Sequence, residues 1–116
     1  MNIPPKIQNQ LNQFEQVRQQ LQLLANQRIQ VESQIRELDN ALEELENSSK
    51  SSVIYKRVGA IMVKVDNKKE LTSSLTEQKE TFDVRVKTLE RQEKQLKERY
   101  SELQKEISKA VQDIEQ

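Results

Sequence analysis

The sequence predicts a mainly α-helical protein: a long antiparallel two-helix coiled coil with one central β-hairpin that assembles into an intersubunit β-barrel. Apolar residues recur at alternating steps of three and four through both halves of the chain, which is the spacing of a coiled-coil seam. Between these halves, β-branched and aromatic residues crowd around the only glycine. The composition is 33% charged and 34% apolar without Trp, too little for a broad core, so residues 1–116 are expected to form a single domain of long helices.

The first helix is expected over residues 5–46. Pro4 and Pro5 mark its start, since proline is tolerated only around a first helical turn. The polar run 47–52 marks its end as a linker. Ten of the twelve seam positions between these limits are apolar, which favours a helix with one narrow buried stripe. The seam positions are Ile7, Gln10, Phe14, Val17, Leu21, Leu24, Arg28, Val31, Ile35, Leu38, Leu42 and Leu45.

The second helix is expected over residues 68–115 and repeats this design. Asn67 and Glu70 have the spacing of a capping box at its start. Ten of its twelve seam positions are again apolar, with Tyr and Ala included. They are Leu75, Lys79, Phe82, Val86, Leu89, Glu93, Leu96, Tyr100, Leu103, Ile107, Ala110 and Ile114. Because the two helices match in length, we expect them to pair as an antiparallel hairpin.

Two polar seam residues, Arg28 and Glu93, fall opposite each other if the chain folds back near residue 60. A polar seam residue typically costs stability while it specifies alignment, so an ion pair here would fix the register of the helices. The alternative is that each side chain reaches past a loosely packed part of the seam.

Residues 53–65 predict a β-hairpin whose turn lies near Val58, Gly59 and Ala60, with Gly59 free to adopt a positive φ. Alternation places Val53, Tyr55, Ile61, Val63 and Val65 on one face with Gly59. It places Ile54, Val58 and Met62 on the other face with Lys56 and Lys64. Both faces would then carry apolar groups, which argues against leaving either in water. The residues expected to mediate oligomerisation are Val53, Ile54, Tyr55, Val58, Gly59, Ile61, Met62, Val63 and Val65.

A two-stranded hairpin is marginal in water, and its open edges are templates for further pairing. We therefore expect hairpins from several chains to join into a shared sheet or barrel. The alternative is a hairpin that folds down over the end of its own coiled coil.

Several classes of function are excluded by the composition. The chain has no His and no Cys, so those residues cannot supply a nucleophile, a base or a metal ligand. Its one glycine leaves no phosphate-binding loop. Lys and Arg balance Asp and Glu at 19 each, which gives no general case for nucleic acid or an anionic membrane. The sequence predicts a cytoplasmic protein without cofactor, metal or catalytic activity.

The whole chain resembles the β-type subunits of prefoldin, most closely the archaeal type. The resemblance is carried by the opening Ile3–Pro5, the glutamine-rich first helix, the strand sequence over residues 53–63 and the segment 89–93. It implies a heterohexamer of two alpha and four beta subunits, joined through hairpins that build a double β-barrel. It also implies an ATP-independent holdase that binds unfolded client proteins and passes them to a group II chaperonin.

For such a function, the candidate client-binding surface is the apolar group near the two ends of the chain, which an antiparallel coiled coil brings together. Leu11 and Val111 lie beside the strict seam and would widen the apolar stripe there. The alternative is that these residues only close the coiled coil. A further rival is a structural scaffold or tether, oligomerised through the hairpin, that needs no exposed apolar end. The candidate residues are Ile3, Ile7, Leu11, Ile107, Ala110, Val111 and Ile114.

Overall fold

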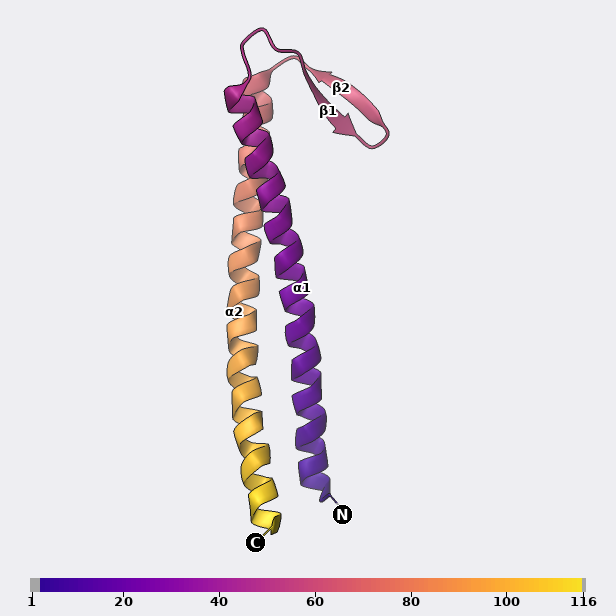
Figure 1. Ribbon diagram of the computed structural model, residues 1–116, viewed down its shortest axis with the longest axis vertical. Coiled ribbons are helices and arrows are strands. Elements are labelled where there is room, and N and C mark those ends of the chain that lie inside the picture. Colours follow the sequence, from indigo (N-terminus) through magenta and orange to yellow (C-terminus); the bar gives the residue numbers. More distant parts are fainter. Residues whose placement is uncertain (1–2, 116) are drawn as a thin grey trace. The chain divides into compact units, whose positions relative to one another are not determined.

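The computed structural model describes residues 3–115, so residues 1, 2 and 116 of the predicted domain lie outside the described part. Four elements follow one another along the chain: α1 (Pro5–Asn47), β1 (Ile54–Val58), β2 (Ile61–Val65) and α2 (Lys68–Glu115) (Figure 1). The prediction of two long helices around one β-hairpin is confirmed. The chain divides into two compact units, one built from the residues up to Ile29 and from Lys87 onward, the other from Gln30–Val86.

Local chemistry sets the helix limits. The Pro4 carbonyl accepts the first helical hydrogen bond, from the backbone N–H of Gln8 at 3.1 Å, so Pro5 takes the first helical position, where its missing N–H costs nothing. At the start of α2 the Asn67 side chain accepts a hydrogen bond from the Glu70 N–H at 3.1 Å, as an N-cap does. The α1 helix runs one residue beyond the predicted end, to Asn47.

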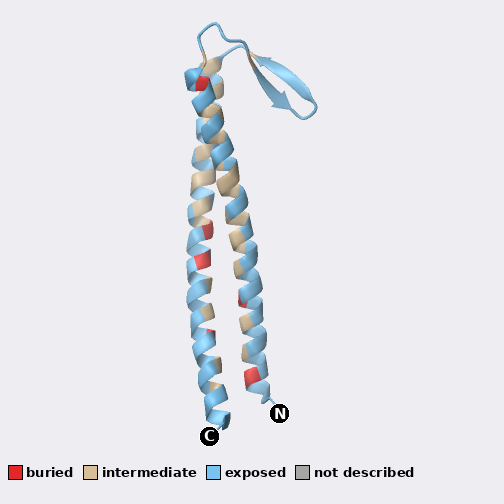
Figure 2. Ribbon diagram, viewed as in Figure 1, coloured by how far each residue is buried: buried red, intermediate tan, exposed pale blue. Residues whose placement is uncertain are grey.

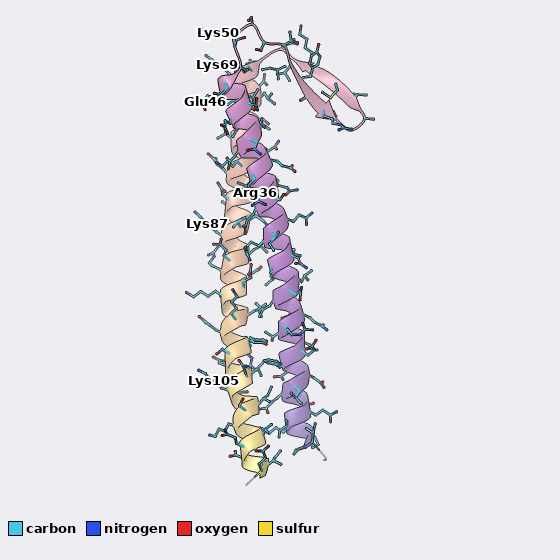
Figure 3. All side chains as sticks on the ribbon, in the orientation of Figure 1. Arg36, Glu46, Lys50, Lys69, Lys87 and Lys105 are labelled. Atoms are coloured by element: carbon cyan, nitrogen blue, oxygen red, sulfur yellow. The ribbon has the colours of Figure 1, made fainter. Side chains whose placement is uncertain are left out.

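In each unit, a segment of α1 lies beside an antiparallel segment of α2, and the buried residues follow the sides that face each other (Figure 2). All twelve seam positions of α1 and eleven of those of α2 are buried or half-buried. Leu89 and Leu103 are the most enclosed, at 1% and 0% exposed. By contrast, charged residues such as Lys87 and Lys105, labelled in Figure 3, are exposed.

The remaining predicted seam residue, Ile114, is 43% exposed and corrects the seam prediction at its end. Phe14 of α1 stacks on Tyr100 of α2, with ring centroids 4.3 Å apart. Beyond Tyr100 the seam residues Ile107 and Ala110 are still half-buried, but Ile114, in the last turn of α2, is not. The cover of the seam therefore ends before the last turn of α2.

The strands pair antiparallel with Val58 opposite Ile61, Lys56 opposite Val63 and Ile54 opposite Val65. Cross-strand partners project from the same face of a sheet. One face, the apolar hairpin face, therefore carries Ile54, Lys56, Val58, Ile61, Val63 and Val65. The other, the cationic hairpin face, carries Tyr55, Arg57, Met62 and Lys64.

This register corrects the predicted faces, which wrongly grouped Tyr55 with Val63. The prediction counted alternation straight through the turn, but alternation holds only within a strand. The turn has two residues, Gly59 and Ala60, so residues of opposite parity meet across it. The hairpin is thus amphipathic, with most of its apolar residues on one face.

The turn itself agrees with its prediction. Gly59 has φ of 60°, and among the described residues no non-glycine has a positive φ. A positive φ at the first of two central residues only is the mark of a type II′ turn, whose twist suits a two-residue hairpin.

Candidate functional site: helix ends, seam pair and hairpin

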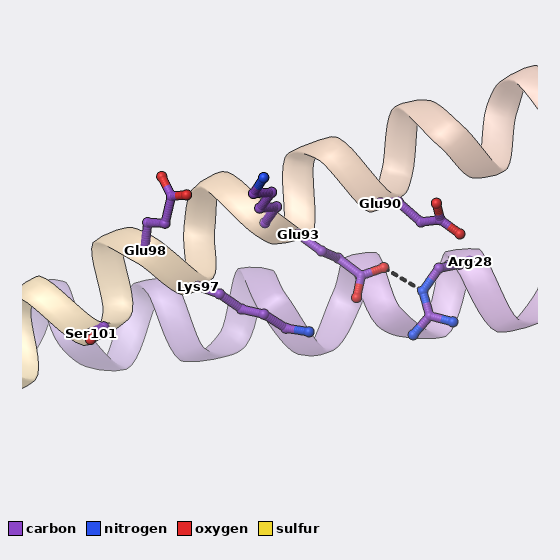
Figure 4. A pocket seen from close by; sticks show the side chains of 7 residues that line it. Arg28, Glu90, Glu93, Lys97, Glu98 and Ser101 are labelled. Carbon is purple, nitrogen blue, oxygen red and sulfur yellow. Dashed lines mark hydrogen bonds and ion pairs between the residues drawn. The ribbon is translucent and has the colours of Figure 1, made fainter.

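The ion pair in the first unit joins Arg28 of α1 to Glu93 of α2 (Figure 4). The Arg28 Nε donates to the Glu93 Oε1 at 2.6 Å, and the Glu93 side chain is only 7% exposed. A buried carboxylate needs such a partner, because an uncompensated charge away from water is strongly unfavourable. The two residues also line an open surface hollow of about 540 Å³, whose other lining residues are Glu90, Lys94, Lys97, Glu98 and Ser101. Whether this pair fixes the register stays a prediction.

The other two polar seam residues have different surroundings. The Lys79 Nζ lies 2.5 Å from an Asp39 carboxylate oxygen, which through its hydrogen bond and its charge raises the pKa of Lys79. Asp39 follows the seam residue Leu38 and lies off the strict seam, so seam spacing alone did not identify it. The Oε1 of Gln10 is buried and accepts no hydrogen bond from the described residues.

The seven residues expected at the helix ends fall into two groups. Ile7 is buried, at 6% exposed, while Ile107 and Ala110 are half-buried, so these three close the seam. The other four remain in solvent, between 38% and 51% exposed, and we call them the helix-end surface: Ile3, Leu11, Val111 and Ile114. Ile3 precedes α1, Leu11 lies near the start of α1, and Val111 and Ile114 lie near the end of α2. These two helix ends lie alongside each other in one unit (Figure 1).

Apolar side chains are also exposed away from the helix ends, at positions not predicted from the sequence. Leu23 is 58% exposed and lines a groove of about 400 Å³ whose lining residues are all leucine or glutamine. The other residues lining it are Gln20, Leu24, Gln92, Gln95 and Leu96. Ile29 and Val84 are exposed as well, at 54% and 64%. The sequence did contain a signal for these exposed residues, because each is apolar and lies off the seam. The same criterion identified Leu11 and Val111.

Most of the predicted oligomerisation residues of the hairpin are exposed. Val53, Tyr55, Val58, Ile61 and Met62 are each at least half exposed. Ile54 and Val65, which pair at the base of the hairpin, are half-buried. A cavity of about 430 Å³ borders the apolar hairpin face and the first turns of α2, and Lys56, Val63 and Glu70 are among its lining residues.

The described residues contain no cluster of three or more His, Cys, Asp or Glu side chains that could hold a metal ion. Within residues 3–115, neither helix contains an apolar stretch long enough to cross a membrane.

Comparison with known proteins connects this architecture to one family. Residues 8–114 match the family model described as "Prefoldin subunit". The chain is 45% identical to the prefoldin subunit beta of Archaeoglobus fulgidus, with 90% of each chain covered. It is 46% identical to that of Thermococcus onnurineus, over 95% of this chain and 94% of the relative.

The architecture itself also has a solved counterpart. The crystal structure of the prefoldin beta subunit from Thermococcus strain KS-1 superimposes with a TM-score of 0.84 at 42% identity, over 94% of this chain and 95% of that one. Sequence and architecture thus agree along nearly the whole chain, helices and hairpin included. The chain therefore belongs to the prefoldin family of chaperone subunits, and within it resembles the beta subunits.

Proposed function

We propose that this chain is a subunit of an ATP-independent holdase that binds unfolded client proteins through its helix-end surface. The observation that carries the proposal is the exposure of Ile3, Leu11, Val111 and Ile114 beside a seam that is otherwise covered. Exposed apolar side chains of this kind suit weak, reversible contact with the apolar segments of a non-native chain. Family membership supports the chaperone role, since relatives along the whole chain are prefoldin beta subunits.

The hairpin is the proposed assembly element. Its strands have open edges and its apolar face carries exposed side chains, both of which favour pairing with hairpins of other chains. We propose that it joins alpha subunits in a complex of two alpha and four beta chains, through a shared β-barrel. Release to a group II chaperonin in the cytoplasm completes the proposed cycle. Each helix-end contact is small enough to dissociate without a nucleotide.

The test is suppression of aggregation, followed by light scattering as a denatured model protein is diluted into buffer without ATP. The chain is assembled with an alpha-type partner, and Leu11, Val111 and Ile114 are each replaced by Gln. The matched control replaces Leu23, Val84 and Ile29 by Gln, which changes the same three residue types at exposed positions elsewhere on the helices.

We expect the helix-end variant to lose most suppression while its molar mass, measured by multi-angle light scattering, stays that of the full assembly. The control should retain suppression. If both variants suppress aggregation like the unchanged chain, the holdase proposal fails and a structural scaffold explains the architecture better. Equal loss in the control would place client binding along the helices and refute its restriction to the ends.

A further inference from the structure

The linker between α1 and β1 and the start of α2 together form a surface hollow of about 600 Å³, which we call the basic hollow. Its lining residues are Lys50, Lys68, Lys69, Thr72 and Ser73, so no acidic residue of the described chain lines it. By contrast, the two hollows lined by Lys94 of α2 also contain Glu90, and their charges are mixed. The basic hollow therefore concentrates positive charge that its own lining does not compensate.

Hydrogen bonds hold the linker beside α2. The Lys68 Nζ donates to the Ser48 carbonyl at 3.2 Å, which ties the linker to the first turn of α2. Within the linker, the Ser52 backbone N–H donates to the Ser49 carbonyl at 3.1 Å, and the hydroxyls of these two residues are hydrogen-bonded at 3.0 Å. Because these bonds fix the backbone on both sides of Lys50, less conformational freedom is lost when a ligand binds there.

The three ammonium groups of the hollow are not paired with carboxylates in the described part of the chain. The ion pairs found there involve other cations, and the Lys68 Nζ donates to a neutral carbonyl instead. Lys50, Lys69 and Ser73 are exposed. Two ammonium groups and one hydroxyl are thus accessible to an incoming hydrogen-bond acceptor.

The basic hollow belongs to a positively charged part of the chain. Between Asn47 and Lys69 lie six basic residues and one acidic residue, Asp66, which gives a net charge of +5. Because the whole chain is neutral, the remainder carries −5. The even overall balance therefore conceals a separation of charge along the sequence. A positive field of this kind attracts an anionic partner and raises its rate of association.

The lining residues favour carboxylates over nucleic acid. Proteins that bind single-stranded nucleic acid stack the bases on aromatic side chains or on arginine, and neither type lines the hollow. Lysine instead presents a compact charge with three N–H donors, which can meet carboxylates in several arrangements. We infer that the basic hollow binds an acidic peptide segment, whose Asp or Glu side chains accept hydrogen bonds from Lys50 and Lys69. The hollow lies outside the hairpin and the helix-end surface, so this inference does not depend on the proposed holdase.

Fluorescence anisotropy of labelled octaglutamate, titrated with the full chain at low ionic strength, measures this binding. The hollow variant combines Lys50→Gln with Lys69→Gln and leaves Lys68, which holds the linker, unchanged. The matched control combines Lys87→Gln with Lys105→Gln, which removes the same charge at exposed positions of α2 outside the hollow (Figure 3). A third variant combines Lys50→Arg with Lys69→Arg and keeps the positive charge.

We expect the hollow variant to bind octaglutamate about tenfold more weakly, because two exposed charge pairs of modest strength are lost. The matched control and the arginine substitutions should leave the affinity close to that of the unchanged chain. The affinity of the unchanged chain should fall in 0.5 M NaCl, since salt screens exposed charges. Circular dichroism checks that the helices are equally formed in all variants.

The inference is overturned if the unchanged chain does not bind octaglutamate, or if the matched control loses as much affinity as the hollow variant. Tighter binding of a single-stranded oligothymidylate of equal charge would assign the hollow to nucleic acid and would overturn it as well. The aggregation assay is independent of these outcomes, because none of its substitutions lies in the hollow.

Discussion

Gly59 determines the geometry of the hairpin at the scale of a single residue. Its φ of 60° lies in the left-handed region that L side chains disfavour, and space for a Cβ atom is not the constraint, because nothing lies within 4 Å of the position where one would be built. The cost of a substitution is therefore conformational, roughly 1–2 kcal/mol for a side chain in this region.

We expect Gly59→Ala to weaken assembly through the hairpin about tenfold, since roughly 1.4 kcal/mol is a factor of ten. Analytical ultracentrifugation of the protein with its alpha-type partner measures this effect. Ala60→Ser is the control, because Ala60 has no positive φ and the change leaves the turn intact. Equal assembly by the two variants would mean that the turn conformation does not limit pairing.

The Arg28–Glu93 pair makes a second prediction about single residues. Arg28→Glu would set a second carboxylate against the buried Glu93, and the loss of one partner from a buried pair typically costs about 3–5 kcal/mol. We expect a clear fall in the free energy of unfolding, measured by urea denaturation. The double variant, Arg28→Glu with Glu93→Arg, should recover much of the lost free energy of unfolding. Failure of the double variant to recover beyond either single variant would refute the register role.

An exposed pair on α1, Glu15 and Arg18, gives the comparison for that experiment. Its shortest N–O distance is also 2.6 Å, but both side chains are about half exposed. Screening by water makes such exposed ion pairs weak. We therefore expect Arg18→Gln to change the free energy of unfolding little. The hydrogen bond from Arg18 lowers the pKa of Glu15. Any contribution is therefore present above the ordinary pKa of a glutamate and is lost as the pH falls through the lowered value.

At the scale of elements, the entrance of α2 depends on one side chain. Asn67 caps this helix through its side-chain oxygen, immediately after β2 ends at Val65. We expect Asn67→Ala to reduce the free energy of unfolding by about 1 kcal/mol, the usual cost of losing an N-cap. Asn40→Ala, an exposed change within α1, should cause no loss, because alanine is the better helix former. Urea denaturation of both variants compares them, and equal stability would show that the cap contributes nothing.

The two helices and the hairpin differ in how they meet their own hydrogen-bonding needs. The helices satisfy their backbone groups internally and need a neighbour only for one apolar stripe. The hairpin satisfies half of its backbone groups and leaves both edges and one apolar face unmatched. That difference explains why the seam residues are largely covered within this chain while Val58 and Ile61 remain exposed.

At the scale of the whole molecule, client binding should depend on how many helix ends act together. One helix-end surface buries little area, but several ends linked in one assembly raise the effective concentration of the remaining contacts. We expect a variant that cannot assemble, with residues 54–65 replaced by a short Gly-Ser linker, to bind a denatured client at least about tenfold more weakly per subunit.

Fluorescence anisotropy of a labelled denatured client measures that difference. Circular dichroism provides the control, because the helices must survive the replacement for the comparison to hold. Suppose that the unassembled variant keeps its helices and still binds the client as tightly as the assembly does. In that case, simultaneous binding by several helix ends contributes nothing to affinity.

The sequence by itself determined where the helices and strands lie, and which residues share a face within one helix or one strand. Heptad spacing located the seams, Pro5 and Asn67 located the helix starts, and the single glycine located the turn, because these signals act over a few residues. The sequence could not show whether Asp39 or another acidic residue forms the ion pair with Lys79. It could not show the exposure of Ile114 either, because this residue occupies a seam position and its cover depends on what lies opposite it in space.

Only the tertiary structure decided the register, and with it the surfaces that matter for assembly. One residue of difference in the turn exchanges the face of every side chain on the following strand. The pairing of Val58 with Ile61 therefore placed Ile61, Val63 and Val65 on the face that already held Ile54, Lys56 and Val58. Sequence periodicity measures distance along an element, whereas this arrangement depends on the alignment between elements.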